Sequence, residues 1–168
     1  MSKMRGAAAI VGIGQTPYYK RGTSPEPELK LALQAVTAAA DDAGIDVRDI
    51  DGFVSYASER SDAPKVMPAL GTRNCRFSTL VWFHGGALSA TMSMAAMAIM
   101  SGQAEIVAIY RSMAESNSQR LRVAVAQDDT SAQYLVNGLD SPAQILGLRA
   151  QRLMEHDGVP RSALKAAT

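Results

Sequence analysis

Three neighbouring residues at one turn, His84, Gly85 and Gly86, have the types and spacing best suited to chemistry. The stretch FHGGALSA joins an apolar, strand-like run to a helix-like run of small residues. The N-terminus of a helix favours negative charge, and enzymes place nucleophiles or bound anions there. No nucleophile stands at this turn, so His84 is its titratable side chain and could act as a base or hydrogen-bond donor. The alternative is a histidine that ends a strand and points away from any site.

The two glycines allow a second kind of chemistry. Gly85 and Gly86 carry no side chain, so their N–H groups could approach a carbonyl oxygen and form an oxyanion hole. Equally, the turn could require glycine for a positive φ or for close packing, and the two explanations are compatible.

Arg111 and Ser112 form a second candidate site, because they directly follow the apolar run AEIVAIY. The carboxyl ends of strands in α/β sheets are where ligands bind, so Arg111 could meet a phosphate. An ordinary surface or interface arginine is the alternative.

Composition argues against several other kinds of site. The single cysteine, Cys75, cannot form an internal disulfide, and the two histidines lie far apart without ligand spacing, so we expect no metal. The 17 basic and 16 acidic residues give a net charge of +1 without blocks, so we expect no nucleic-acid partner. No apolar run is long enough for a membrane span, and we expect a soluble cytoplasmic protein.

Strands and helices must position these residues. The apolar run Ala7–Ile13 predicts a buried first strand. Ser24 as N-cap, Pro25 at the first helical position and Gly44 as C-terminal cap predict a helix between them.

The middle of the chain repeats this alternation. Residues 58–74 hold two prolines and many polar residues, and we expect a loop with at most one helical turn. The apolar and β-branched runs predict strands at residues 53–56, 75–83 and 104–110. Between the last two, one helical face that runs from Leu88 to Ile99 predicts a helix that ends at Gly102.

The order of elements predicts an α/β layered domain with a mixed, mostly parallel sheet. We expect a core over residues 6–112, and a polar loop excursion over 113–140 that could be a lid or dimer loop. Residues 141–168 predict helices, the first between Ser141 as cap and Gly158. The last helix has only begun when the chain stops, so we expect an incomplete domain.

Four segments resemble the thiolase superfamily, most closely its sterol-carrier and lipid-transfer-protein branch. They read AAIVGIGQTPY, ELKLALQAVTAAADDAGIDVRDIDGFV, MAAMAIMSGQAEIVAIYRSM and SPAQILGLRAQRLMEHDGVPRSAL. The resemblance covers nearly the whole chain, and implies the N-terminal half of a layered αβαβα thiolase fold, usually dimeric, that acts on acyl-CoA thioesters. Coenzyme A would enter as part of the substrate, without a further cofactor.

The chain departs from thiolases at the position of their acyl-accepting cysteine, which the resemblance places at Gly85. Cysteine-less members of the branch resemble steroid side-chain aldolases, which cleave a β-hydroxyacyl-CoA by a retro-aldol step beside an OB-fold acyl-CoA-binding partner. The resemblance thus implies a lyase for a steroid or other bulky acyl-CoA that needs its C-terminal half or a partner. His84 would be the base, Gly85 and Gly86 the oxyanion donors, and Arg111 with Ser112 the contacts to coenzyme A.

Two alternatives stay open. The chain could be a non-catalytic acyl-CoA-binding, lipid-binding or scaffold subunit. It could also be a thiolase-type acyltransferase working through Cys75, although a lone cysteine at a strand start is usually an inert, half-buried side chain.

Overall fold

The computed structural model describes residues 6–20, 22–56, 61–82, 87–114 and 129–166, and these form two compact units, Met1–Ser116 and Asn117–Thr168. The first unit alternates helices and strands. Its elements are α1 (Glu28–Ala43), a 3₁₀ turn (Val47–Asp49), β1 (Gly52–Tyr56), α2 (Ala63–Leu70), β2 (Phe77–Val81), α3 (Ala87–Met100) and β3 (Val107–Tyr110). The second unit holds α4 (Asp129–Val136), α5 (Pro142–Asp157) and α6 (Arg161–Ala166).

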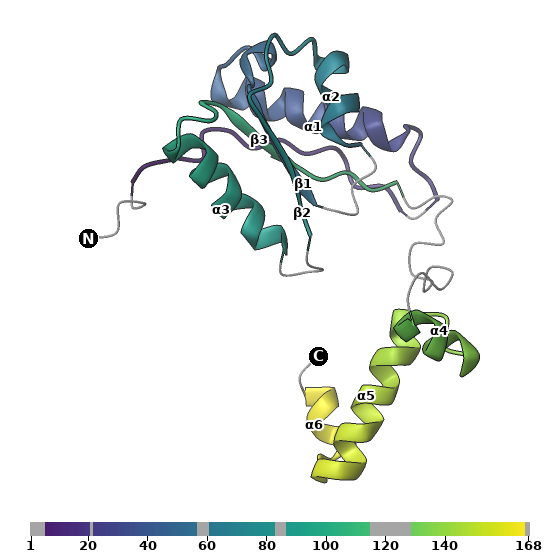
Figure 1. The fold of residues 1–168 in the computed structure, drawn as a ribbon. Helices are drawn as coiled ribbons and strands as arrows, with labels where there is room; N and C mark the ends of the chain where they lie inside the picture. The colour runs from purple at the N-terminus through teal and green to yellow at the C-terminus, as the bar shows by residue number, and fades with distance from the viewer. Residues whose placement is uncertain (1–5, 21, 57–60, 83–86, 115–128, 167–168) are drawn as a thin grey trace. The chain divides into compact units, whose positions relative to one another are not determined.

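The strands of the first unit form a parallel sheet in the order β2-β1-β3 (Figure 1). Phe53 lies opposite Ser78 on one side and Ala108 on the other, which fixes the register. Because the strands are parallel and in register, Tyr56 of β1 ends at the same edge as Val81 of β2. The predicted α/β class with a parallel sheet is confirmed.

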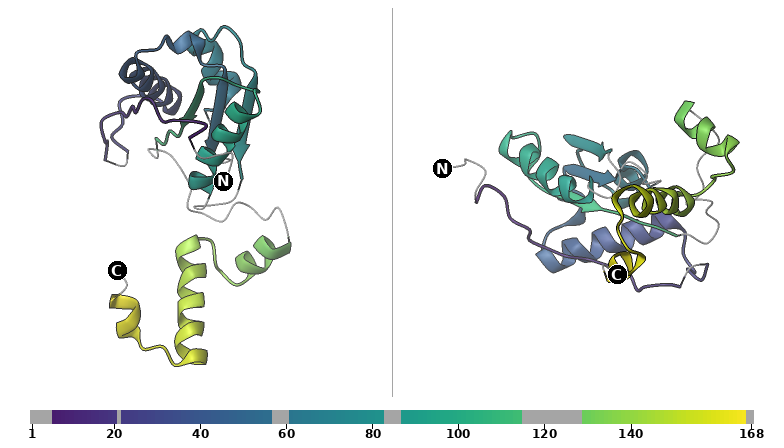
Figure 2. Two further views of the ribbon diagram at one scale, coloured as in Figure 1. Left: turned by 90° about the vertical axis from the view of Figure 1, so that its left-hand side faces the viewer. Right: turned by 90° about the horizontal axis from the view of Figure 1, so that it is seen from below.

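Helices cover both faces of this sheet, with α3 on one face and α1 on the other (Figure 2, left). Phe53 and Tyr110, which meet edge to face at 6.5 Å between ring centroids, pack with Val36 of α1 and Val66 of α2. Successive side chains of a strand point to opposite faces. Val54, fully buried, therefore lies on the face opposite Phe53. The core is thus three layers deep and has α1 and α2 on the side of Phe53.

The first helix begins later than the sequence predicts. Pro27, not Ser24, is its N-cap, while the Ser24 hydroxyl bonds to the backbone of Glu26 in a local turn. Its end is as predicted, because Gly44 takes the left-handed conformation with φ of 69°.

The prediction of a buried strand at Ala7–Ile13 is wrong. The segment is extended but joins no strand among the described residues, and Ile10 and Ile13 are 71% and 76% exposed. An apolar run in the sequence indicates a segment that could form a strand. Whether the segment pairs depends on a neighbouring strand from elsewhere in the chain, which the run itself does not reveal.

The prediction of a loop over residues 58–74 is wrong in part, since α2 occupies two turns of it. A proline at the first turn suits a helix start, and Gly71 ends the helix with φ of 70°. The misleading residue was Pro68, which lies inside α2 although proline lacks the N–H that a helix interior uses.

The second unit contains the other helices. Ser141 is the N-cap of α5, as predicted, and forms a capping box with Gln144, while Gly158 closes the helix with φ of 65°. The expected loop over 113–140 is partly helical, because α4 lies within it.

Candidate substrate-binding site at the carboxyl edge of the sheet

The carboxyl ends of β1 and β3 bring Tyr56 and Arg111 together. The guanidinium carbon of Arg111 lies 4.2 Å from the centre of the Tyr56 ring, a cation–π contact. A guanidinium nitrogen of Arg111 also donates to the sulfur of Met113 at 3.4 Å. Arg111 is therefore held in place at the edge of the sheet instead of extending freely into solvent.

Buried hydrogen bonds fix the strand ends beneath this contact. The Ser55 hydroxyl, on a side chain 1% exposed, donates to the carbonyl of Tyr110 at 2.7 Å. The phenol of Tyr110 in turn donates to the carbonyl of Ser61 at 2.7 Å. Tyr56 and Arg111 each directly follow a residue of this chain of bonds, so their backbones have defined positions.

A hollow of about 190 Å³ lies at this edge. Residues Gly14–Thr16 line one part of it, Arg111–Met113 another, and Leu31 and Ala35 of α1 complete it. Ligand pockets usually measure roughly 300 to 1,000 Å³, so this one admits part of a ligand at most. Ser112, 5% exposed, lines it beside Arg111, and the structure thus brings both predicted coenzyme-A contacts to one cavity.

The predicted residues His84, Gly85 and Gly86 lie outside the described residues. The helix that follows them, α3, begins at Ala87. Their roles as base and oxyanion donors stay predictions.

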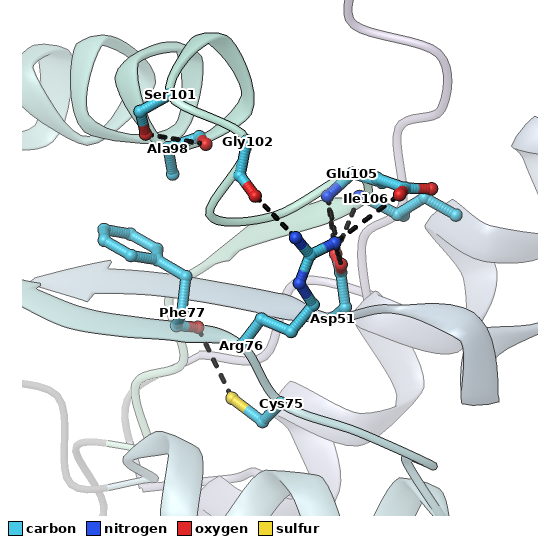
Figure 3. Close-up of polar contacts among 9 residues, drawn as sticks. All are labelled: Asp51, Cys75, Arg76, Phe77, Ala98, Ser101, Gly102, Glu105 and Ile106. Atoms are coloured by element: carbon cyan, nitrogen blue, oxygen red, sulfur yellow. Dashed lines mark hydrogen bonds and ion pairs between the residues drawn. The ribbon is translucent and has the colours of Figure 1, made fainter.

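Cys75 lies at the opposite, amino edge of the sheet, just before β2 (Figure 3). Burial raises the pKa of its thiol, and the negative charge of Asp51 acts in the same direction. Its sulfur lies 3.4 Å from the Phe77 carbonyl. A nucleophilic cysteine needs a lowered pKa, so the environment of Cys75 is that of an inert thiol.

The same amino edge holds a polar cluster that sequence reasoning missed (Figure 3). The carboxylate of Asp51 accepts hydrogen bonds from the backbone N–H groups of Glu105 and Ile106, at 2.9 and 2.8 Å. Arg76 pairs with that carboxylate at 3.3 Å and donates to the carbonyl of Gly102. These contacts join the beginnings of all three strands and are structural.

Two further parts of the carboxyl edge were missed. Tyr56 could have been found as the polar aromatic residue that ends a predicted strand, by the same reasoning that found Arg111. The position of Gly14–Thr16 at the hollow had no signal in the sequence. The apolar run before them predicts a buried strand and says nothing of a ligand site.

Neither a metal site nor a membrane helix is found in the described part of the chain. No group of three or more histidine, cysteine or acidic side chains could hold a metal ion there. None of the described helices is long and apolar enough to cross a membrane.

No family model matches the chain, but individual relatives do. It is 39% identical over 166 residues to the steroid side-chain-cleaving aldolase of Thermomonospora curvata, and 34% identical over 163 residues to the 17-hydroxy-3-oxo-4-pregnene-20-carboxyl-CoA lyase of Mycobacterium tuberculosis. These matches cover 94% and 92% of this chain but 42% of each relative, so the chain spans less than half the length of either.

A solved structure is similar as well. The Ltp2-ChsH2(DUF35) aldolase matches with a TM-score of 0.74 and 36% identity, over 90% of this chain and 38% of the other. The chain is therefore similar, along nearly all its length, to part of a set of proteins named as steroid side-chain aldolases and lyases.

Proposed function

We propose that this chain contributes acyl-CoA binding and part of the catalytic framework to a lyase that cleaves a steroid β-hydroxyacyl-CoA by a retro-aldol step. The observation that carries the proposal is the 39% identity, over 94% of this chain, with a steroid side-chain-cleaving aldolase. Since 42% of that relative is matched, the activity would need polypeptide corresponding to the remainder.

The proposed reaction needs a base and an oxyanion site, and it needs no covalent nucleophile. The base removes the proton of the β-hydroxyl, whose oxygen becomes a ketone or aldehyde oxygen as the bond between the α and β carbons breaks. The electron pair of that bond forms the enolate of the thioester, with negative charge on the thioester oxygen. A proton then returns to the α carbon, which releases a shorter acyl-CoA.

We assign the base to His84 and the oxyanion donors to the N–H groups of Gly85 and Gly86. The sequence supports this assignment, because the three residues directly precede Ala87, where α3 begins. The positive end of a helix dipole stabilises an adjacent enolate oxygen. Gly85 at the position of the thiolase nucleophile is compatible with chemistry that leaves the enzyme unacylated.

We assign binding of a coenzyme A phosphate to Arg111, with Ser112 beside it. The ring of Tyr56 lies against the face of the guanidinium, whereas phosphate oxygens bind in the guanidinium plane. The contact with Tyr56 therefore orients the side chain without competing for the same direction. No cofactor is required, since coenzyme A arrives with the substrate.

Partners are part of the proposal. The similar aldolase structure has two named components, Ltp2 and ChsH2(DUF35), which supports an acyl-CoA-binding partner protein for this chain. We also propose a homodimer in the cytoplasm. Trp82 and Leu80, 75% and 43% exposed at the edge strand β2, offer a surface for the second copy.

The test is turnover of a defined substrate. The purified chain is incubated with 17-hydroxy-3-oxo-4-pregnene-20-carboxyl-CoA, alone and with the separately produced remaining portion of the T. curvata aldolase. We expect the 17-ketone and a shorter acyl-CoA, detected by mass spectrometry, in the mixture only. His84→Ala should abolish this turnover, while His156→Ala, a change on α5, should leave it intact. A mixture that binds the substrate without cleaving it would instead identify a binding or scaffold subunit.

The properties and position of the Cys75 thiol argue against the acyltransferase alternative. Burial raises the pKa of Cys75, and the residue precedes β2 at the amino edge, away from the edge that carries Arg111.

A further inference from the structure

Asn137 and Gly138 form an asparagine–glycine pair directly after the last residue of α4. Both residues are exposed, and they lie in the short connection between α4 and α5 (Figure 1). The chain has two other asparagines, Asn74 and Asn117, which precede a cysteine and a serine. Glycine has no side chain to shield its backbone nitrogen, so this nitrogen can approach the preceding side-chain amide more easily than at the other two positions.

The backbone of Gly138 is open to solvent. Its φ is 73°, the left-handed conformation that commonly follows the end of a helix. A Cβ atom built on this residue would meet nothing within 4 Å. Water therefore has access to the peptide bond between Asn137 and Gly138.

The side-chain amide of Asn137 caps the end of α4. Its nitrogen donates to the carbonyl of Gln133 at 2.7 Å. The backbone N–H of Asn137 donates to the carbonyl of Tyr134 at 3.1 Å, so the side chain serves the carbonyl that this N–H would satisfy in a continuing α-helix. One amide group thus holds the helix end and lies beside the backbone nitrogen of a glycine.

We propose that Asn137 is a site of spontaneous deamidation, and that this modification removes the cap of α4. The backbone nitrogen of Gly138 attacks Cγ of the Asn137 side chain and loses its proton, and the bond from Cγ to Nδ2 breaks with release of ammonia. Water then opens the five-membered imide that has formed. The products are aspartate and its isomer isoaspartate, in which the chain continues through the side chain. Water is the co-reactant, and ammonia is the leaving group.

The folded helix end restrains this reaction. The N–H of Gly138 donates to the carbonyl of Leu135 at 2.9 Å, while the amide of Asn137 is bound to Gln133. Both bonds must break before the nitrogen and Cγ can meet. Because α4 has eight residues, and a helix this short has little stability of its own, its last turn opens easily.

The product keeps the helix end open. A carboxylate accepts hydrogen bonds and cannot donate one to the carbonyl of Gln133. Its negative charge also lies at the negative end of the α4 dipole, which destabilises the last turn. Opening of α4 therefore favours deamidation, and deamidation in turn favours opening. The inference concerns this helix end alone, so it stands or falls separately from the proposed function.

Timed incubation of the full 168-residue chain tests the chemical step. The protein is kept in mildly alkaline buffer, and mass spectrometry follows the replacement of the amide by a hydroxyl group in the peptides that contain Asn137 and Asn74. We expect Asn137 to convert several-fold faster than Asn74, and faster still in guanidinium chloride, which opens α4. Asn137→Gln keeps an amide on a longer side chain, so the imide would need a six-membered ring and conversion should slow several-fold. Equal rates at Asn137 and Asn74 would overturn the proposal.

A second variant tests the effect on α4. Asn137→Asp places the carboxylate in every molecule, and the amides at the end of α4 and of Leu139, which donates to Tyr134, should exchange hydrogen about tenfold faster. Asn74→Asp makes the same change before Cys75 and should leave exchange in α4 as it is in the wild type. Wild-type exchange of α4 in Asn137→Asp would contradict the inference that deamidation opens the helix end.

Discussion

The two ends of the same parallel sheet use polar residues in opposite ways. At the amino edge, Asp51 and Arg76 satisfy one another and the backbone of the neighbouring strand. At the carboxyl edge, Tyr56 and Arg111 hold each other beside a hollow of about 190 Å³. Charged residues at the end of a sheet thus indicate a ligand site where they border a hollow, and a structural role where they tie strand to strand.

The largest effect is expected at Asp51, whose contacts give the amino edge its structural role. Asp51→Ala leaves the N–H groups of Glu105 and Ile106 without their acceptor, on a side chain only 13% exposed. We expect a loss of about 2 to 3 kcal/mol in the free energy of unfolding, measured by urea denaturation. Asp140→Ala, an exposed change before α5, should stay within about 0.5 kcal/mol of wild type. If the amino edge has only a structural role, the folded Asp51→Ala variant should bind coenzyme A as tightly as the wild type. A loss of affinity in the folded variant would contradict that role.

At the carboxyl edge, we expect a change at Arg111 to affect the binding of coenzyme A. Arg111→Lys keeps the charge but loses the planar guanidinium that lies on Tyr56, so coenzyme A should bind about tenfold more weakly by calorimetry. The matched change Arg149→Lys on α5 should have no effect on affinity. Equal affinities in the two variants would remove Arg111 from the site.

A smaller effect is expected from Tyr56, which acts through Arg111. Tyr56→Leu removes the ring under the guanidinium, and the affinity for coenzyme A should fall about two- to fivefold, in line with a cation–π contact of about 0.5 to 1 kcal/mol. The same substitution at Tyr18, 93% exposed, is the control. If Arg111 does bind a phosphate, Tyr56→Leu made in the Arg111→Lys background should weaken binding less than it does alone.

The smallest expected effect concerns Cys75. Because its pKa is raised by burial, less thiolate is present at pH 7.5, and iodoacetamide should alkylate the folded chain several-fold more slowly than the chain in urea. As the pH rises through the ordinary thiol pKa, the unfolded chain releases this proton before the folded one does, so stability should fall slightly there. Faster alkylation of the folded chain would mean an activated thiol at the amino edge.

The sequence correctly predicted those helix ends that are set by a capping residue. Gly44 and the Ser141 cap ended or began helices as expected, since a left-handed glycine or a capping hydroxyl acts within a few residues. The strand at residues 7–13 and the loop over 58–74 could not be predicted correctly, because strand pairing and the helix around Pro68 depend on distant packing.

The candidate site was predictable from the sequence only in part. Arg111 and Ser112 follow from the rule that ligands bind at carboxyl ends of strands, and the structure places both at the hollow. That rule could not predict that Gly14–Thr16 also line the hollow. These residues end no strand of the sheet, and they lie far from Arg111 in the sequence.

The double capping of α5 has a mechanical consequence. A helix whose two ends are fixed by Ser141 and Gly158 keeps its length wherever it lies, so its 16 residues form a rod of about 24 Å. Leu146 and Leu153, 59% and 39% exposed, lie two turns apart on one side of that rod, about 10 Å from each other along its axis. A surface that packs against this side of α5 must offer two apolar depressions at about that spacing.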